Sequence, residues 1–366
     1  MYWGSELNIR NHLPVLIAQY EHLRAPGEVC PYPPLNLNVE LSNRCNLRCI
    51  SCFHSNSNFK NLPFMTMETF TSVLDQAAGH CDRLTFGNHG ENMLHPEFLP
   101  MLRLAKERGF FINLITNATL LTAEQANAII ALGLDRIVFS LDSMDPGTYE
   151  ALRVGARFDA TLRNVLYFLK KNYEEGIPVY VNISTVNTKK ALGGSVSVFD
   201  FFQDLPVHVV YTSDLLNFHG SAESVNEETY FETRYKELPQ TQWPICKNGW
   251  DRMLIRADGD VALCVIDWDF VYSLGNVRDV HLMELWNNEK AQAYRRSLLK
   301  KDYRCIEKNG KLCTACDGKF NNSIERQREY LFQVLAQGMK CESERAKTLC
   351  NAHQRYENVC ARLEGR

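Results

Sequence analysis

The sequence lacks three features that would assign it to whole classes of protein. No apolar run approaches the roughly 18 residues that a membrane-spanning helix needs. The first 22 residues are interrupted by polar side chains, unlike the apolar region of a secretory signal. An excess of one charge is also missing, because 40 Lys and Arg residues against 43 Asp and Glu leave a net charge of −3. We therefore expect a cytoplasmic protein without a membrane or nucleic-acid partner.

Cysteine, by contrast, is abundant, at 13 of 366 residues. The chain is 45% hydrophobic and 23% charged, which is typical of a soluble globular protein with two or three domains. In a reducing compartment, clustered thiols bind metal or carry out redox chemistry more often than they form disulfides. The positions of the cysteines are therefore the first guide to function.

The first group of cysteines is Cys45, Cys49 and Cys52, three thiols within eight residues. It follows the alternating apolar residues of Leu35–Leu41, which predict a strand. Zinc favours four ligands arranged in pairs, and three thiols on one loop fit that preference poorly. Three thiolates suit a [4Fe–4S] cluster better, because they bind three irons and leave the fourth open to another ligand.

This C-x3-C-x2-C loop resembles the signature of the radical S-adenosylmethionine (SAM) enzymes. The resemblance implies a [4Fe–4S] cluster whose open iron binds SAM and cleaves it reductively to a 5′-deoxyadenosyl radical. It also implies a flavodoxin- or ferredoxin-type electron donor and a partial (β/α)6 barrel. The residue before the third cysteine, commonly aromatic in the family, is Ser51 here, so we expect the aromatic contact to the cofactor from Phe53.

Downstream, strand-like and helix-like stretches alternate, as in a parallel α/β barrel. Helical periodicity is clearest over Phe98–Arg108 and over Ala123–Leu132, where Thr122 is the expected N-cap. The expected strands cover Arg83–Phe86, Phe111–Ile115, Arg136–Asp142, Val179–Thr185 and Val207–Tyr211. Since catalytic groups of such barrels lie at the carboxyl ends of the strands, we expect the site there.

The resemblance extends to cofactor-binding residues after successive strands. Glu91, with the backbone at Gly90, would bind the SAM amino group. Ser140 would contact the ribose, and the Arg153 guanidinium suits the SAM carboxylate. The expected cofactor contacts are Phe53, Gly90, Glu91, Asn117, Ser140, Arg153 and Asn182, the last after the fifth strand as a further ribose contact.

The second group of cysteines is Cys246, Cys264, Cys313 and Cys316. The first two flank an expected hairpin, Met253–Leu263, with a turn at Asp258-Gly259. From spacing alone, zinc and an iron–sulfur cluster are equally good interpretations.

The surroundings of these four cysteines, including Leu274-Gly-Asn and Leu285-Trp-Asn, resemble the SPASM/Twitch extension of radical SAM enzymes. The resemblance implies one auxiliary [4Fe–4S] cluster. Where a full SPASM domain has further cysteines, this chain has Asn322 and Arg326. We therefore expect the one-cluster version, as in the aminocyclitol dehydrogenase of butirosin biosynthesis.

The expected fold is α/β, a partial (β/α)6 TIM-type barrel with a small α+β Cys-rich auxiliary-cluster domain and a helical tail. The expected parts are an N-terminal extension over residues 1–34, the barrel over 35–225, the auxiliary domain over 240–322 and the tail over 323–366. The tail cysteines Cys341, Cys350 and Cys360 are expected to be buried small apolar residues, and a structural role is expected for all six remaining cysteines, which also include Cys30, Cys81 and Cys305.

The substrate class stays open at the level of sequence. One hypothesis is oxidation of a small polyol or aminosugar in natural-product biosynthesis, with the auxiliary cluster as electron acceptor and Asp267 or Asp269 as base. A second is modification of a ribosomally made peptide. A third is radical epimerisation, with Cys81 or Cys305 as hydrogen donor. The non-enzymatic alternative is a binding module with zinc at both cysteine groups.

Overall fold

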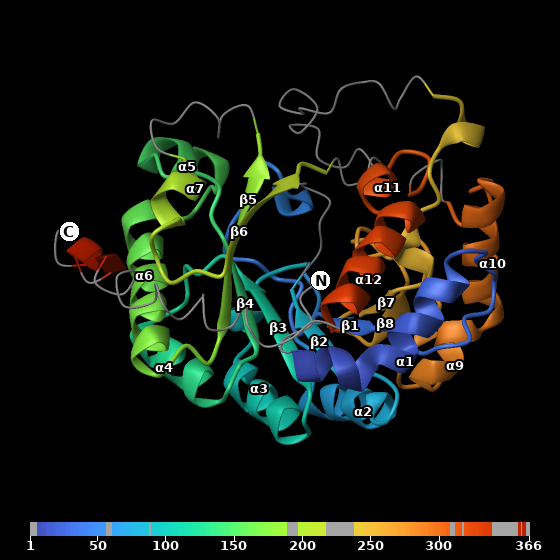
Figure 1. Ribbon diagram of the computed structural model, residues 1–366, viewed down its shortest axis with the longest axis horizontal. Coiled ribbons are helices and arrows are strands. Elements are labelled where there is room, and N and C mark those ends of the chain that lie inside the picture. Colours follow the sequence, from blue (N-terminus) through green and yellow to red (C-terminus); the bar gives the residue numbers. More distant parts are fainter. Residues whose placement is uncertain are drawn as a thin grey trace.

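The computed structural model describes residues 6–55, 61–87, 89–188, 197–216, 238–307, 312–316, 318–338, 358–359 and 361–363. Nine strands in these ranges form one sheet, in the order β6-β5-β4-β3-β2-β1-β7-β8-β9 (Figure 1). The strands are β1 (Asn36–Val39), β2 (Arg83–Phe86), β3 (Phe111–Thr116), β4 (Arg136–Ser140), β5 (Tyr180–Asn187), β6 (Val209–Asp214), β7 (Arg252–Ile255), β8 (Asp260–Ala262) and β9 (Gly275–Asn276).

Each pair of neighbours from β1 to β6 is parallel, and helices connect the strands, which confirms the expected partial barrel. The helices of this part are α2 (Met67–Ala77), α3 (Phe98–Glu107), α4 (Ala123–Ala131), α5 (Pro146–Leu152), α6 (Phe158–Glu174) and α7 (Val198–Phe202), with short 3-10 turns η1 (Phe53–Ser55) and η2 (Asn92–Leu94). Thr122 caps α4 as expected, in a capping box with Gln125.

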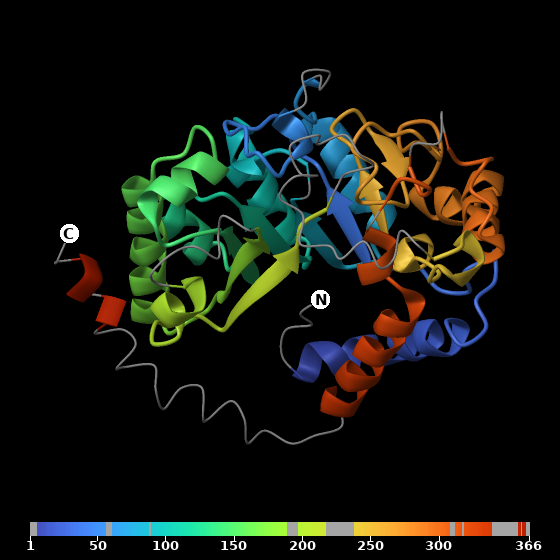
Figure 2. The ribbon, with the colours of Figure 1, turned by 90° about the horizontal axis from the view of Figure 1, so that it is seen from above.

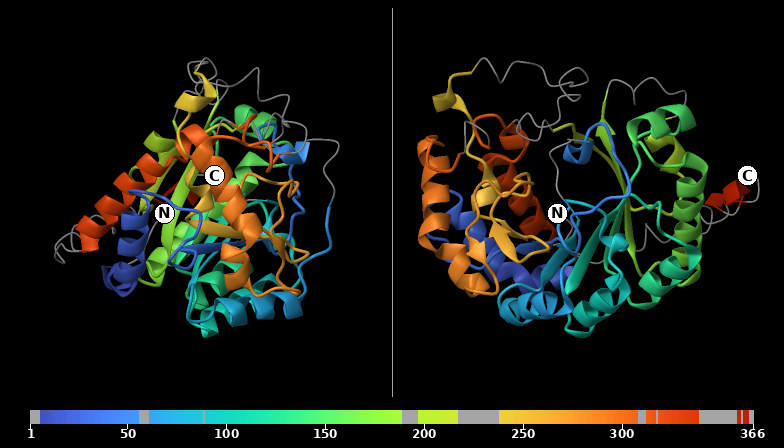
Figure 3. Two further views of the ribbon diagram at one scale, coloured as in Figure 1. Left: turned by 90° about the vertical axis from the view of Figure 1, so that its right-hand side faces the viewer. Right: turned by 180° about the vertical axis from the view of Figure 1, so that it is seen from behind.

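The remaining helices belong to the two ends of the chain and the auxiliary domain. They are α1 (Glu6–His22), η6 (Gln240–Gln242), η7 (Lys247–Gly249), α9 (Leu282–Asn287), α10 (Glu289–Lys300), α11 (Gly318–Asn321) and α12 (Ile324–Gly338). Figures 2 and 3 show α1 and α12 side by side, on the other side of the curved sheet from α2 to α6.

The expected hairpin forms as β7 and β8, and Gly259 takes a φ of +87° in its turn. Strand β7 pairs in parallel with β1, with Leu37 opposite Met253. The hairpin therefore extends the barrel sheet, so the barrel and the auxiliary domain share one sheet. This pairing places the strand that leads to the first group of cysteines beside the hairpin that Cys246 and Cys264 flank.

The helical tail begins as expected with α12, which attaches to the auxiliary domain. Ile324 N donates to Ile245 O at 2.9 Å, and Lys247 Nζ donates to Gln327 Oε1 at 3.0 Å. The tail cysteines Cys341, Cys350 and Cys360 lie outside the described residues.

Side chains alternate along β1 between an apolar and a polar face. Leu37 and Val39 belong to the apolar core. Asn36 and Asn38 point to the other face, where Asn36 Nδ2 donates to Asn38 Oδ1 at 2.5 Å. Thr85 Oγ1 of β2 donates to Asn36 Oδ1 at 3.1 Å, which continues the polar layer across the sheet. The inner face of the barrel is thus polar and hydrogen-bonded.

Candidate active site

The loop after β1 carries Cys45, Cys49 and Cys52, all partly exposed. Backbone hydrogen bonds hold it against the end of α5, from Arg48 N to Val154 O at 2.9 Å and from Ile50 N to Leu152 O at 3.0 Å. Burial raises the pKa of the Cys45 thiol to about 11 and that of Cys52 to about 12. Metal binding at this loop must therefore displace protons.

Gly90 packs directly against this loop. Its φ is +78°, and a Cβ atom there would lie 2.4 Å from Ser42 O and 2.7 Å from Arg44 O. The next residue strengthens the contact, because Glu91 N donates to Arg44 O at 2.8 Å. Gly90 is therefore required for the loop after β2 to approach the cysteine loop.

The Glu91 carboxylate is buried and fully engaged. It accepts from Asn117 N at 2.8 Å, from Met93 N at 3.2 Å and from Thr116 Oγ1 at 3.0 Å. Burial raises the pKa of Glu91 above its usual range, against the effect of these hydrogen bonds. Glu91 thus fastens the end of β2 to the end of β3, a role that the sequence did not reveal.

Two further expected residues lie beside the cysteines. Asn117 Nδ2 lies 3.9 Å from Cys45 Sγ and 3.1 Å from Asn46 Oδ1. Arg153 forms a buried ion pair with Asp142, with Nε 2.8 Å from Oδ2. Burial disfavours the charged guanidinium, but Asp142 and Cys49 more than offset this effect and raise the pKa of Arg153. A permanent positive charge therefore lies near Cys49.

Ser140 and Asn182 take different positions. Ser140 is the last residue of β4 and is partly exposed there, as the cofactor role requires. Asn182 lies inside β5, near its beginning, rather than after it, and is 3% exposed. When the side-chain amide is oriented so that both its oxygen and its nitrogen have hydrogen-bond partners, the oxygen accepts from Arg136 Nη2 at 2.7 Å. Arg136 is the first residue of β4. The structure thus places Asn182 away from the carboxyl ends of the strands, contrary to expectation.

Phe53 is buried directly after the third cysteine and is the centre of an aromatic group. Its ring stacks on Trp268 with centroids 5.4 Å apart and an interplanar angle of 8°. His89 meets the same ring edge-on at 5.1 Å. Trp268 belongs to the segment after Cys264, so the contact joins the two cysteine groups.

His89 and Glu40 were not identified from the sequence. Both are 1% exposed, and His89 Nδ1 lies 3.4 Å from Glu40 Oε1. His89 Nε2 lies 3.0 Å from Val265 O, one residue after Cys264. The alternation of side chains along β1 could have identified Glu40, because it places Glu40 on the same polar face as Asn36 and Asn38.

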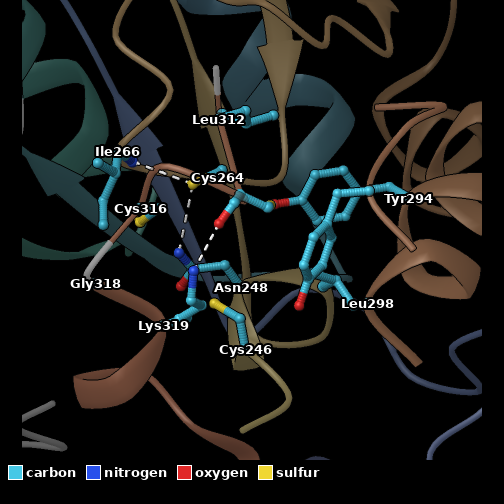
Figure 4. Close-up of a pocket in the computed structure, with 12 residues that line it drawn as sticks. Cys246, Asn248, Cys264, Ile266, Tyr294, Leu298, Leu312, Cys316, Gly318 and Lys319 are labelled. Atoms are coloured by element: carbon cyan, nitrogen blue, oxygen red, sulfur yellow. Dashed lines mark hydrogen bonds between the residues drawn. The ribbon is translucent and has the colours of Figure 1, made fainter. Parts of the chain in front are cut away.

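The second group of cysteines lines one cavity (Figure 4). The Cys264 sulfur accepts from Asn248 Nδ2 at 3.6 Å and from Ile266 N at 3.4 Å. Burial raises the pKa of Cys246 to about 12 and that of Cys264 to about 11. The thiols that line the cavity are Cys246, Cys264, Cys313 and Cys316.

The donor set of the second group suits an iron–sulfur cluster. Four thiols surround a shared space, which is the arrangement that a [4Fe–4S] cluster requires. The residues therefore fit an auxiliary cluster.

Asp267 and Asp269 are not placed as a catalytic base. The Asp267 carboxylate is 1% exposed and accepts from Val271 N at 2.8 Å and from Tyr272 N at 3.1 Å. Burial raises its pKa to about 7. Asp269 is exposed. Asp267 therefore stabilises a turn, and the geometry does not support the expected catalytic role of either carboxylate.

The two possible thiol donors lie in different places. Cys81 is buried just before β2, at the opposite end of the strand from Gly90, and its sulfur contacts Arg83 O at 3.6 Å. Cys305 is exposed, and its sulfur lies 2.7 Å from Ser297 Oγ. Cys305 does not line the auxiliary cavity.

Two family models match this chain. Residues 39–189 match the radical SAM superfamily, and residues 246–317 match the SPASM iron–sulfur cluster-binding domain. The first range begins in β1 and contains the first cysteine group, and the second begins at Cys246. No helix among the described residues is long and apolar enough to cross a membrane.

Curated relatives have several functions. A tungsten-containing aldehyde ferredoxin oxidoreductase cofactor-modifying protein from Pyrococcus furiosus is 28% identical over 298 residues, 71% of this chain and 82% of the relative. A probable GTP 3′,8-cyclase from Methanocella arvoryzae is 31% identical over 206 residues, 55% of this chain and 64% of the relative. A PqqA peptide cyclase from Streptomyces rochei is 29% identical over 150 residues, 41% of this chain and 40% of the relative.

Solved structures share the fold. The BtrN complex with AdoMet and 2-DOIA has a TM-score of 0.51 and 18% identity, covering 78% of this chain and 93% of BtrN. Streptococcus suis SuiB bound to its precursor peptide SuiA has a TM-score of 0.59 and 17% identity, covering 78% of this chain and 71% of SuiB. With both cysteine sites on this fold, the chain is a radical SAM enzyme with a SPASM-type auxiliary iron–sulfur domain.

Proposed function

We propose that this enzyme oxidises a carbinol of a small polyol or aminosugar to a carbonyl. With its cluster and SAM bound, the loop of Cys45, Cys49 and Cys52 supplies a 5′-deoxyadenosyl radical, after an electron arrives from a flavodoxin- or ferredoxin-type donor. The auxiliary cavity supplies an electron acceptor. The reaction class is therefore a two-electron oxidation.

One observation carries this proposal: the segment after Cys264 reaches the first cysteine loop. Val265 O is 3.0 Å from His89 Nε2, and Trp268 stacks on Phe53, the residue after Cys52. A substrate radical formed beside Trp268 would lie next to a segment that begins at Cys264, one of the four cysteines that would hold the auxiliary cluster. That cluster is the proposed electron acceptor. Oxidation uses this proximity directly, whereas a redox-neutral epimerisation does not need it.

The electrons and protons of the proposed oxidation balance. The carbinol C–H bond breaks, and its hydrogen atom forms 5′-deoxyadenosine. The hydroxyl proton passes to a base, and the remaining unpaired electron passes to the auxiliary cluster as the C=O double bond forms. The structure favours Glu40 with His89 as the base, because Asp267 is occupied by a turn and Glu40 Oε2 has no hydrogen-bond partner among the described residues.

The support for a small hydroxyl-rich substrate comes from a similar structure and not from the polar layer of Thr85, Asn36 and Asn38. Those side chains bond to one another, and Thr85 and Asn38 lie nearer the strand starts than Asn182 does. BtrN, which shares the fold, was solved with 2-DOIA.

Peptide modification is the second candidate. It is favoured by the names of two similar proteins, the PqqA peptide cyclase and SuiB with its precursor peptide. Epimerisation receives less support, because Cys81 lies at the opposite end of β2 from Gly90 and Cys305 is exposed beside Ser297 of α10.

The test uses the anaerobically purified full chain with SAM, a reductant and candidate substrates deuterated at carbon. The candidates are 2-DOIA, other aminosugars and polyols, and a panel of short peptides. Deuterium in 5′-deoxyadenosine together with a carbonyl product from a polyol would support the proposal. Deuterium transfer from peptides alone would overturn it in favour of peptide modification, and zinc without iron would exclude radical chemistry altogether.

A further inference from the structure

Lys319 is a buried cation in the wall of the auxiliary cavity. It belongs to α11, directly after Gly318, and is 5% exposed. Its Nζ atom donates to the carbonyl oxygen of Cys313 at 2.8 Å and lies 3.5 Å from the centroid of the Trp243 ring. Figure 4 shows the ammonium group directed into the space between Cys246 and Cys264.

Asn248 is a second donor in the same wall. It lies in η7, two residues after Cys246, and is 1% exposed. Its Nδ2 atom is 3.6 Å from the Cys264 sulfur, which also accepts from Ile266 N. Asn248 and Lys319 thus approach the sulfur cavity from different elements, and they place an amide N–H and a positive charge beside it.

We infer that Lys319 and Asn248 raise the reduction potential of the auxiliary cluster. A reduced cluster carries one more negative charge than an oxidised one, so a nearby cation and N–H donors to its sulfurs stabilise the reduced form. Burial strengthens both interactions, because water does not screen them. These two side chains thereby make the auxiliary cluster a better electron acceptor.

This inference deepens the proposed oxidation but rests only on the presence of the auxiliary cluster. The potential is a property of the resting holoenzyme and needs no substrate. A chain that oxidises none of the tested polyols would overturn the proposed function and leave the potential to be measured. Conversely, oxidation could be established while the potential proves insensitive to both side chains.

A merely structural role is the competing explanation, since Lys319 also holds the loop of Cys313. The variants separate the two roles. Lys319→Met removes the charge and Lys319→Arg keeps it, while Asn248→Leu removes the donor at similar volume. Lys290→Met is the matched control, because Lys290 lies in the same domain on α10 and does not line the cavity.

The experiment is an EPR-monitored redox titration of the anaerobically purified, iron-replete full chain. We expect Lys319→Met and Asn248→Leu each to lower the ratio of reduced to oxidised auxiliary cluster at the wild-type midpoint by roughly three- to tenfold. A tenfold change equals about 59 mV for a one-electron couple. In Lys319→Arg and Lys290→Met, the auxiliary cluster should keep the wild-type midpoint potential. The SAM-binding cluster should keep its own wild-type midpoint in every variant.

Unchanged auxiliary midpoints in iron-replete Lys319→Met and Asn248→Leu would overturn the inference. An equal shift in Lys319→Arg and Lys319→Met would also overturn it, because loss of packing rather than charge would then be the cause. If Lys319→Met fails to retain iron, Asn248→Leu decides by itself, since it leaves the contact between Lys319 and Cys313 intact.

Discussion

His89 bridges Glu40 and Val265, with Nδ1 3.4 Å from Glu40 Oε1 and Nε2 3.0 Å from Val265 O. A carbonyl oxygen only accepts, so Nε2 carries a hydrogen. Nδ1 faces a carboxylate oxygen of Glu40. The pair lies in a buried position where the ends of β1 and β2 meet the segment after Cys264.

We expect Glu40→Gln to destabilise the fold by about 1–3 kcal/mol, because it removes the charge that faces His89 in a buried site. Thermal unfolding of the anaerobic protein, followed by circular dichroism, measures the effect. Asp302→Asn is the control, since Asp302 pairs with the 91% exposed Arg304 and should have no measurable effect. Equal melting temperatures for Glu40→Gln and the wild type would contradict the buried pair.

Gly90→Ala should disrupt the first cysteine loop. A Cβ atom there would meet Ser42 O at 2.4 Å, and the φ of +78° adds strain of about 1–2 kcal/mol for any residue with a side chain. Gly109→Ala is a matched control, because Gly109 has a φ of +81° and a Cβ atom added there would have nothing within 4 Å.

Iron content and 5′-deoxyadenosine formation should therefore fall in Gly90→Ala and stay near the wild-type values in Gly109→Ala. Equal losses in the two variants would mean that backbone conformation alone, rather than contact with the cysteine loop, explains the need for glycine at position 90.

The two cysteine groups should be separable by substitution. Cys45→Ala/Cys49→Ala/Cys52→Ala should abolish 5′-deoxyadenosine formation and reduce iron from about eight to about four atoms per chain. Cys246→Ala/Cys264→Ala should lose a similar amount of iron but keep reductive SAM cleavage. Product analysis by chromatography and iron analysis provide the readouts, and 5′-deoxyadenosine from the first variant would refute the assignment of that loop.

Asp251 anchors the start of β7, and its loss should be costly. The side chain is fully buried, with Oδ2 2.9 Å from Lys247 Nζ and 2.8 Å from Arg252 Nη2. Burial by itself would raise its pKa, but Arg252 and Lys247 more than offset burial and lower the pKa to about 2. Asp251→Asn leaves both cations without their counterion, so we expect a loss of about 3–5 kcal/mol.

The effect of Asp251 on stability has a defined pH dependence. Its pKa is lower in the folded than in the unfolded chain, whose value is near 3.8, so the stabilisation is complete above that value and is lost as the pH falls towards 2. Urea unfolding at pH 6, 7 and 8 should therefore give the same difference between Asp251→Asn and the wild type. The exposed Asp279 provides the control Asp279→Asn, and a difference that changes across this pH range would contradict the assignment.

Local patterns predicted much of the fold. The strand at Arg83–Phe86 and the cap at Thr122 follow from neighbouring residues, because strand period and capping are set within a few positions. The expected position of Asn182 was wrong, because local patterns do not fix where a strand begins. The alternation of side chains along a strand predicts that Asn182 faces the inside of the barrel. Its distance from the carboxyl end depends instead on where β5 begins and how it pairs with β4.

The sequence by itself determined the three-thiol loop and the Asp258-Gly259 turn, since both depend on short-range spacing. Only the tertiary structure decided that β7 pairs with β1, that Asp267 caps a turn and that His89 meets Val265. Those contacts join residues far apart in the chain, or depend on the path of one loop. Such arrangements are selected by packing and hydrogen bonding of the whole molecule, which no local pattern records.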